Sequence, residues 1–191
     1  MGDARDRWLD EGVRVLAAEG SAGLRIDRIA ARLGLSKGSF HHHFDGADGY
    51  RRALLAHVER LAVAAVDRAV AQTADARDVR SVLARLTALV EPAAAGLYRP
   101  ELDVALRAWA TTDDDARAVQ ARIDGARLAA LERVWRPHTG SAEEARRAAL
   151  LPYLALVGAA VVVPPVGAAE LRAVLEQLLP LVPEGDAAPE A

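Results

Sequence analysis

Cysteine is absent from this 191-residue sequence, which excludes disulfide bonds, thiolate zinc sites and thiol nucleophiles. The chain also has no glycine-rich phosphate loop, no serine nucleophile elbow and no paired His-Glu motif of a helical metalloenzyme. We therefore expect neither enzymatic activity nor a bound cofactor.

Neither sign of charge dominates, because 24 lysines and arginines stand against 27 aspartates and glutamates. This near balance argues against a wholly basic surface, but not against one local basic face. The N-terminus, MGDARDRWLDEG, lacks the basic start and the apolar run of a secretory signal. We expect a cytoplasmic protein.

One uncharged run, residues 148–169, is long enough to cross a bilayer. Pro152 lies early in this run, and Pro164 and Pro165 end a helix at about Val163. The unbroken apolar helix is then only about a dozen residues long, which is typical of a buried core or interface helix. We expect no membrane span.

Strand signals are sparse, while Ala, Leu, Arg and Glu dominate long stretches, so the sequence predicts an all-α fold. Hydrophobic periodicity predicts about nine helices, at residues 4–19, 26–33, 37–44, 47–72, 79–94, 101–110, 115–135, 142–163 and 168–179. Ser36 is an expected N-cap, Ser141 and Glu144 form an expected capping box, and Pro100 suits the start of a helix.

The most informative segment is residues 26–50, IDRIAARLGLSKGSFHHHFDGADGY. It predicts two short helices joined by about three residues that include Gly34, which is the spacing of a helix-turn-helix. Close crossing of the helices needs a small residue at Ala30, and Gly34 supplies a backbone conformation that side chains resist. Such helix pairs also occur in proteins that bind no DNA, so the spacing alone is compatible with a DNA-binding role and with a purely structural one.

Helical geometry divides the second of these helices into two faces. The inner face is predicted to hold Phe40, His43 and Phe44, and the outer face Lys37, Gly38, His41 and His42. A polar outer face that contains a glycine suits insertion into the DNA major groove. Residues 20–52 carry six basic against three acidic side chains, whereas residues 1–19 carry three against five, so positive charge is expected where groove contact is predicted.

In residues 29–40, IAARLGLSKGSF, and at His43 and Phe44 the sequence resembles the TetR family of transcriptional regulators. Residues 107–110, RAWA, with the charged residues that follow, resemble a pattern of one branch of that family. The resemblance implies a helix-turn-helix DNA-binding domain at residues 1–46 and a helical ligand-binding and dimerisation domain at residues 47–183. The acidic tail at residues 184–191 is expected to be disordered.

The resemblance also implies the residues that touch base pairs or phosphates. Together with the outward face, the predicted DNA-binding residues are Arg25, Lys37, Gly38, Ser39, His41, His42 and His43. The chain departs from the family at His41, where tyrosine is common, at Ala47, where a phosphate-binding lysine is common, and at Arg25, where a serine or threonine cap is usual. Ala47 cannot bind a phosphate, so this phosphate contact is lost unless Arg51 or Arg52 replaces it.

The histidine triplet at residues 41–43 is not expected to bind a metal. Consecutive helical residues point in different directions, and only residues three or four apart can share an ion. The pattern favours exposed or DNA-contacting side chains for these histidines, with a core role for His43.

A ligand cavity is expected between the helices of the larger domain, with an effector that the sequence does not identify. The predicted ligand-binding residues are Tyr98, Arg107, Trp109 and Trp135. Tryptophan on an amphipathic helix is more often core, and arginine more often solvated, so a purely structural role is the alternative for each.

Residues 150–163 predict a helix that is apolar nearly all round and needs burial on every side. Pairing of this helix and the last helix with their copies in a second chain would form a four-helix homodimer interface, and the family resemblance implies the same homodimer. The predicted interface residues are Leu151, Leu154, Val157, Val161, Leu171, Val174, Leu175 and Leu178. A core role within one chain is the alternative.

The sequence thus predicts a homodimeric regulator, a repressor of a palindromic DNA operator that a small-molecule effector releases. The alternative is a helical small-molecule binding or adaptor protein whose helix-turn-helix no longer reads DNA. Retention of specific DNA distinguishes the two.

Overall fold

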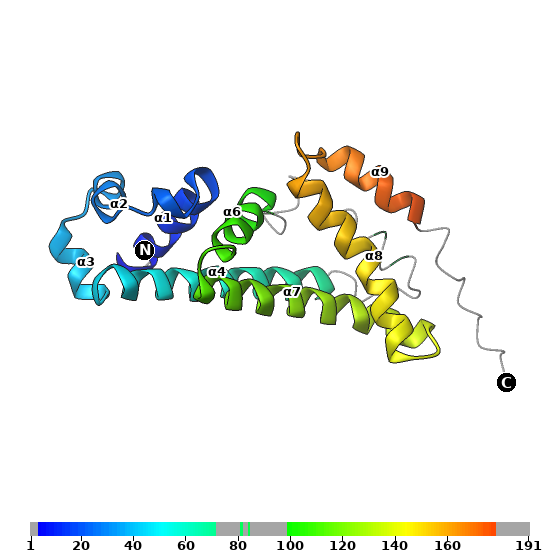
Figure 1. Cartoon of the computed structure of the whole chain (residues 1–191). Coiled ribbons are helices and arrows are strands. Elements are labelled where there is room, and N and C mark those ends of the chain that lie inside the picture. The colour runs from blue at the N-terminus through cyan, green and yellow to red at the C-terminus, as the bar shows by residue number, and fades with distance from the viewer. Residues whose placement is uncertain (1–3, 72–80, 82–83, 85–98, 179–191) are drawn as a thin grey trace. The chain divides into compact units, whose positions relative to one another are not determined.

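The computed structural model describes residues 4–71, 81, 84 and 99–178, and all regular structure in these ranges is helical (Figure 1). The predicted all-α class is confirmed. The elements are α1 (Ala4–Glu19), the short 3-10 helix η1 (Ser21–Gly23), α2 (Ile26–Leu33), α3 (Lys37–His43), α4 (Gly46–Ala71), α6 (Pro100–Ala110), α7 (Asp114–Trp135), the 3-10 helix η2 (Arg136–His138), α8 (Ala142–Val161) and α9 (Ala168–Leu178).

Each helix predicted within the described ranges begins and ends within two residues of an observed one. The helix predicted at residues 79–94 and the tail at residues 184–191 lie outside the described residues. In the part of the chain that the structure describes, no helix combines the length and the hydropathy that a membrane span requires.

The chain divides into two compact units. We call Met1–Ala62 with Arg99–Ile123 the head unit, and Val63–Tyr98 with Asp124–Ala191 the second unit. The predicted domain boundary at residue 46 falls inside the head unit, because the core of this unit continues past α3.

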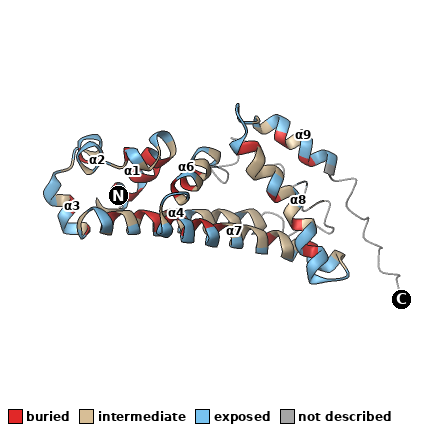
Figure 2. Ribbon diagram, viewed as in Figure 1, coloured by how far each residue is buried: buried red, intermediate tan, exposed pale blue. Residues whose placement is uncertain are grey.

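The head unit has one hydrophobic core, whose buried residues appear in red in Figure 2. It forms because α1 carries apolar residues at helical spacing, including Trp8, Leu9 and Leu16, which are fully buried. The other contributions come from α2, α3, the first half of α4, α6 and the first half of α7, and include Ile29, Phe40, Leu54, Leu106, Trp109 and Val119. Helix α6 is therefore part of the core that supports the helix-turn-helix.

The second unit contains two smaller apolar clusters. One joins Trp135 at the end of α7 to Ala145 and Ala149 of α8, and the other joins Ala159 of α8 to residues of α9. The expected capping box starts α8: the Ser141 hydroxyl oxygen accepts from the Glu144 backbone N–H at 3.1 Å. The Glu144 carboxylate accepts from the Gly140 N–H at 2.9 Å, one residue earlier than in the standard reciprocal pair.

Candidate nucleic-acid interface

The turn between α2 and α3 has the backbone that the sequence predicts. Gly34 ends α2 with φ 63° and ψ 31°, in the left-handed region, and its N–H bonds to carbonyl oxygens of the last turn of α2. Ser36 precedes α3, and its hydroxyl oxygen accepts from the Ser39 backbone N–H at 3.2 Å. These two caps fix where α2 ends and where α3 begins.

Helix α3 has the two faces expected of a recognition helix. Phe40 is fully buried, with its ring centroid 5.2 Å from that of Trp8 and 5.6 Å from that of Tyr50. Phe44, directly after α3, is also buried. The opposite face is exposed and contains Lys37, Gly38, His41 and His42.

The remaining predicted DNA-binding residues border this face. His43 and Ser39 are partly buried. Arg25 stands exposed at the N-cap position of α2, makes no side-chain capping bond, and lies 3.7 Å from the Asp27 carboxylate. The structure therefore places all seven predicted residues on or beside α3 or at the start of α2.

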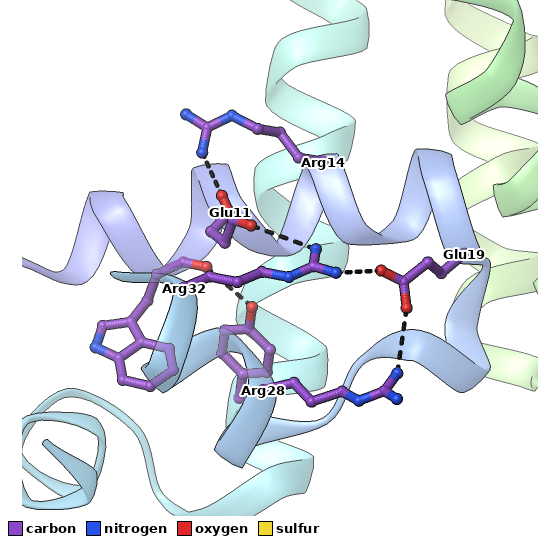
Figure 3. Close-up of polar contacts among 7 residues, drawn as sticks. Glu11, Arg14, Glu19, Arg28 and Arg32 are labelled. Carbon is purple, nitrogen blue, oxygen red and sulfur yellow. Dashed lines mark hydrogen bonds and ion pairs between the residues drawn. The ribbon is translucent and has the colours of Figure 1, made fainter. Parts of the chain in front are cut away.

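Much of the positive charge predicted for the helix-turn-helix is paired inside the head unit (Figure 3). Arg32 on α2 lies between two carboxylates of α1, at 2.5 Å from Glu19 and 3.5 Å from Glu11. Arg28 reaches Glu19 at 3.5 Å, and Arg14 pairs with Glu11 on α1 itself. The hydrogen bond with Glu19 holds the pKa of Arg32 above its ordinary value.

These pairs neutralise arginines that a count along the sequence assigns to the DNA-facing surface. Glu11 is buried although it is acidic. Its position three residues after Trp8 and four before Val15 places it on the apolar stripe of α1, and this spacing is the signal that predicts a buried partner.

Of the two residues considered as substitutes at the start of α4, Arg51 is already engaged. Its guanidinium donates to the Asp113 carboxylate at 2.6 Å and lies 5.9 Å from the centroid of the Trp109 ring. Arg52 is exposed. Ala47 is exposed as well, but its methyl group has no hydrogen-bond donor for a phosphate.

The predicted ligand-binding residues do not share one cluster. Trp109 is buried in the head core, and Arg107 donates to Asp103 at 2.9 Å on the same helix. Trp135 is buried in a different cluster, and Tyr98 lies outside the described residues. Trp109 also lines a cleft of about 280 Å³ in the head unit, together with Ser21, Ala22, Leu24, Ile26, Ala47, Tyr50 and Arg51.

The predicted dimer residues divide into exposed and buried groups. Leu151, Leu154, Val161 and Val174 are exposed, and Val157 is partly buried. Leu171 and Leu175 are buried against α8 within the chain, which is the single-chain core role that the sequence left as the alternative. The side chain of Leu178 lies outside the described residues.

Histidine, aspartate and glutamate form no group suited to a metal ion in the described ranges. His41 and His42 are exposed on α3, and the ring of His43 lies 6.3 Å from that of Phe44.

Comparison with known proteins agrees with this geometry. Residues 9–49 match the family model described as bacterial regulatory proteins, tetR family. That range ends in the first turn of α4 and contains every residue of the exposed face of α3. A search of the curated proteins finds no match.

Solved structures of similar fold cover nearly the whole chain. NemR of Escherichia coli in its reduced form has 18% identity and a TM-score of 0.78, over 97% of this chain and 100% of its own. A TetR-family transcriptional regulator from Streptomyces coelicolor has 20% identity and a TM-score of 0.73, over 95% and 96%. A transcriptional regulator from Saccharomonospora viridis, solved in complex with choline, has 22% identity and a TM-score of 0.71, over 93% and 95%.

Proposed function

We propose that the chain is a cytoplasmic repressor that binds a palindromic DNA operator as a homodimer and leaves it when a small-molecule effector binds. The match of residues 9–49 to the TetR family of bacterial regulatory proteins supports this proposal. The single observation that carries the proposal is the division of α3 into a buried aromatic face and an exposed polar face. The exposed face holds a lysine, a glycine and two histidines, which are residue types suited to contact with phosphates and base edges.

The exposed face of α3 supplies the chemistry of major-groove recognition. Lys37 carries a positive charge, and His41 and His42 can donate hydrogen bonds to phosphates or to base edges. A Cβ on Gly38 would meet only the Ser36 hydroxyl, at 3.5 Å, so the glycine leaves room for close approach of a DNA strand.

Homodimer formation is supported by apolar side chains that α8 leaves uncovered. Leu151 is 50% exposed and Leu154 61% exposed on the same face of this helix. A second copy of α8 would cover that face, and the two-fold symmetry of the dimer would present two copies of α3 to two half-sites about one helical turn of DNA apart or a multiple of it.

Release by an effector requires that the ligand bind the DNA-free state more tightly than the DNA-bound state. The relative that holds choline supports the idea of a small-molecule site in a helical regulator of this fold. For this chain the effector site is proposed within the helices after residue 46. Arg107, Trp109, Trp135 and Tyr98 remain candidates to be tested by substitution.

The proposal is tested by recovering genomic DNA fragments that the purified protein retains at moderate salt, and by sequencing them. A shared palindrome is expected with the wild-type chain and is expected to be lost with Lys37→Ala combined with His41→Ala. Both side chains are exposed, so the variant should keep the helical circular dichroism spectrum and the melting temperature of the wild type.

Lys37→Ala alone should weaken binding to the recovered site by about tenfold, as expected for removal of one charged interaction worth about 1.4 kcal/mol. The matched control is Arg136→Gln in η2, which removes one exposed positive charge outside the head unit. Unchanged affinity of Lys37→Ala would contradict the role of α3 in DNA contact.

The alternative function is a helical small-molecule binding or adaptor protein that no longer reads DNA. It is favoured by the pairing of Arg28 and Arg32 with carboxylates and by the absence of a basic side chain at Ala47. Enrichment of no sequence by the wild-type chain would support this alternative over the repressor.

A further inference from the structure

The distribution of unpaired positive charge around α3 is uneven. Lys37 stands at the N-terminal end of α3, whereas the C-terminal end is followed by Phe44 and by the exposed carboxylate of Asp45. A recognition helix lies between two phosphate backbones, so a cation is expected near each end of the helix. Helix α3 has seven residues and is about 10 Å long, so Lys37 cannot serve both ends.

Most arginines near α3 are committed to partners within the head unit. Arg14, Arg28 and Arg32 pair with Glu11 and Glu19, and Arg51 pairs with Asp113.

Two further arginines have weaker partners. Arg7 donates to the Leu33 carbonyl at 3.0 Å, and Arg25 lies 3.7 Å from the Asp27 carboxylate. Within the described part of α1 to α3 and the first two turns of α4, the lysine and arginine side chains with no carboxylate or carbonyl partner are Arg5, Lys37 and Arg52.

Arg5 is the member of this set that lies at the C-terminal end of α3. It belongs to the first turn of α1, and its guanidinium carbon is 5.6 Å from the centroid of the Phe44 ring. Phe44 is buried and is held by Phe40 and Tyr50, with ring centroids at 5.3 Å and 5.0 Å. The ring that Arg5 contacts is therefore packed against two aromatic side chains of the head core.

We propose that Arg5 binds a phosphate of the DNA backbone beside the C-terminal end of α3, opposite in position to the contact of Lys37. This proposal rests on the proposed DNA-binding function. A guanidinium that packs against an aromatic ring uses its face for that contact, while its N–H donors point outward in its plane. Those donors match the oxygens of a phosphate, and the Phe44 ring limits the conformational entropy that Arg5 loses on binding.

Arg52, the other unpaired arginine, lies on α4 four residues after Asp48, on the exposed side of that helix. Asp48 is 80% exposed at this position and repels a phosphate, which makes the surface around Arg52 less favourable than the ring that supports Arg5.

The test measures DNA affinity as a function of salt, from about 50 to 200 mM, on a duplex of about 30 base pairs recovered with the wild-type chain and on a duplex of unrelated sequence. The variants are Arg5→Gln, Arg5→Lys and Arg52→Gln, with Arg136→Gln as the matched removal of one exposed charge in the second unit.

Arg5→Gln should weaken binding to both duplexes by a similar factor, because phosphate contacts carry no sequence information. The slope of log affinity against log salt should become shallower by about 0.9 for each phosphate that the variant no longer neutralises, which is about 1.8 for a dimer. Arg5→Lys should restore the slope and only part of the affinity, since lysine keeps the charge but not the stacked, two-pronged geometry. Arg136→Gln should change neither quantity.

Each other outcome overturns the proposal at a defined step. A wild-type slope in Arg5→Gln, with wild-type affinity, removes Arg5 from the interface while the DNA-binding function stands. A change of slope confined to Arg52→Gln assigns the phosphate to α4 instead. Failure of the wild-type chain to retain any genomic duplex removes the DNA-binding function, and with it the role of Arg5.

Discussion

Gly12 on α1 faces Tyr50 on α4 at a distance that admits no side chain. A Cβ at Gly12 would lie 2.2 Å from the Tyr50 hydroxyl oxygen and 3.0 Å from Cδ1 of Leu54. Tyr50 is only 2% exposed, and its hydroxyl donates to the Trp8 carbonyl oxygen at 2.9 Å. Burial raises the pKa of Tyr50, so the hydroxyl keeps its proton and its role as donor across the physiological range.

We expect Gly12→Ala to destabilise the chain by about 1–2 kcal/mol net. Overpacking of the core costs up to about 3 kcal/mol, and the gain in helix propensity offsets about 1 kcal/mol of it. The measurement is urea unfolding followed by circular dichroism. Tyr50→Phe removes the oxygen that clashes, so Gly12→Ala should cost less in that background than in the wild type. Equal costs in the two backgrounds would show that the close approach of Gly12 and Tyr50 is not the cause.

At the level of single residues, the sequence predicts what depends on local spacing and misses what depends on tertiary pairing. The division of α3 into the Phe40 face and the Lys37 face follows from a period of 3.6 residues, and the structure confirms it. The partner of Arg32 is Glu19, thirteen residues away on another helix, and no periodicity links the two. Counting charge along the chain therefore overstates the positive charge available to DNA.

Two ion pairs join α4 to α7 within the head unit. Arg51 donates to Asp113 just before α7, and Arg122 donates to both oxygens of Glu59 at 2.7 and 2.8 Å. The pKa of Asp113 is lowered, chiefly because its carboxylate accepts from the Ala116 backbone N–H and further because Arg51 is close. The pKa of Glu59 is lowered chiefly by its hydrogen bond from Arg122.

A carboxyl group whose pKa falls on folding stabilises the native state above its unfolded pKa, and that contribution is lost as the pH falls through the folded pKa. We expect Asp113→Asn to lower the stability at pH 7 by about 1 kcal/mol, the order of one partly exposed charge-assisted contact. Asparagine can still cap α7, so the substitution isolates the charge. At a pH near 3, below the ordinary value of 3.8 for aspartate, the difference from the wild type should shrink.

The measurement is urea unfolding at the two pH values. Asp114→Asn is the matched control, because Asp114 is the next residue, is 92% exposed and pairs only at the surface with Arg117. A stability loss for Asp113→Asn that is the same at both pH values would contradict an ionic role for the link between α4 and α7.

Helix boundaries were predictable because caps and breakers such as Ser36, Gly34 and Pro100 act on the backbone next to them. The packing partners of a helix were not predictable, since its apolar face does not specify which other helix packs against it. Helix α6 is the clearest case: its Trp109 was predicted as a ligand contact, but in the structure this side chain is part of the core behind the helix-turn-helix. The ligand role of Trp109 stays a prediction that the adjoining cleft keeps open.

For the molecule as a whole, the exposed apolar residues on α8 determine how the proposed homodimer is best tested. Leu151, Leu154 and Val161 recur at spacings of three and seven residues, so they lie along one face of the helix. Leu175 was predicted at the interface, but it is buried against α8 together with Leu171. A charge at Leu175 would therefore disrupt the packing of α9 on α8, whatever the state of assembly.

Leu154 is the informative position, because it is 61% exposed in the single chain and loses little there when it becomes charged. We expect Leu154→Glu to convert a dimer into monomers in sedimentation equilibrium, since two glutamates would face one another across the two-fold axis in an apolar surface. The melting curve of the monomer should still be cooperative, and affinity for a two-half-site duplex should fall much more than affinity for one half-site.

The control is Val163→Glu, which places the same charge at a residue that is 95% exposed beyond the end of α8 and should leave the dimer intact. If Leu154→Glu remains a dimer, the interface lies elsewhere than on this face of α8, and another surface sets the spacing of the two copies of α3.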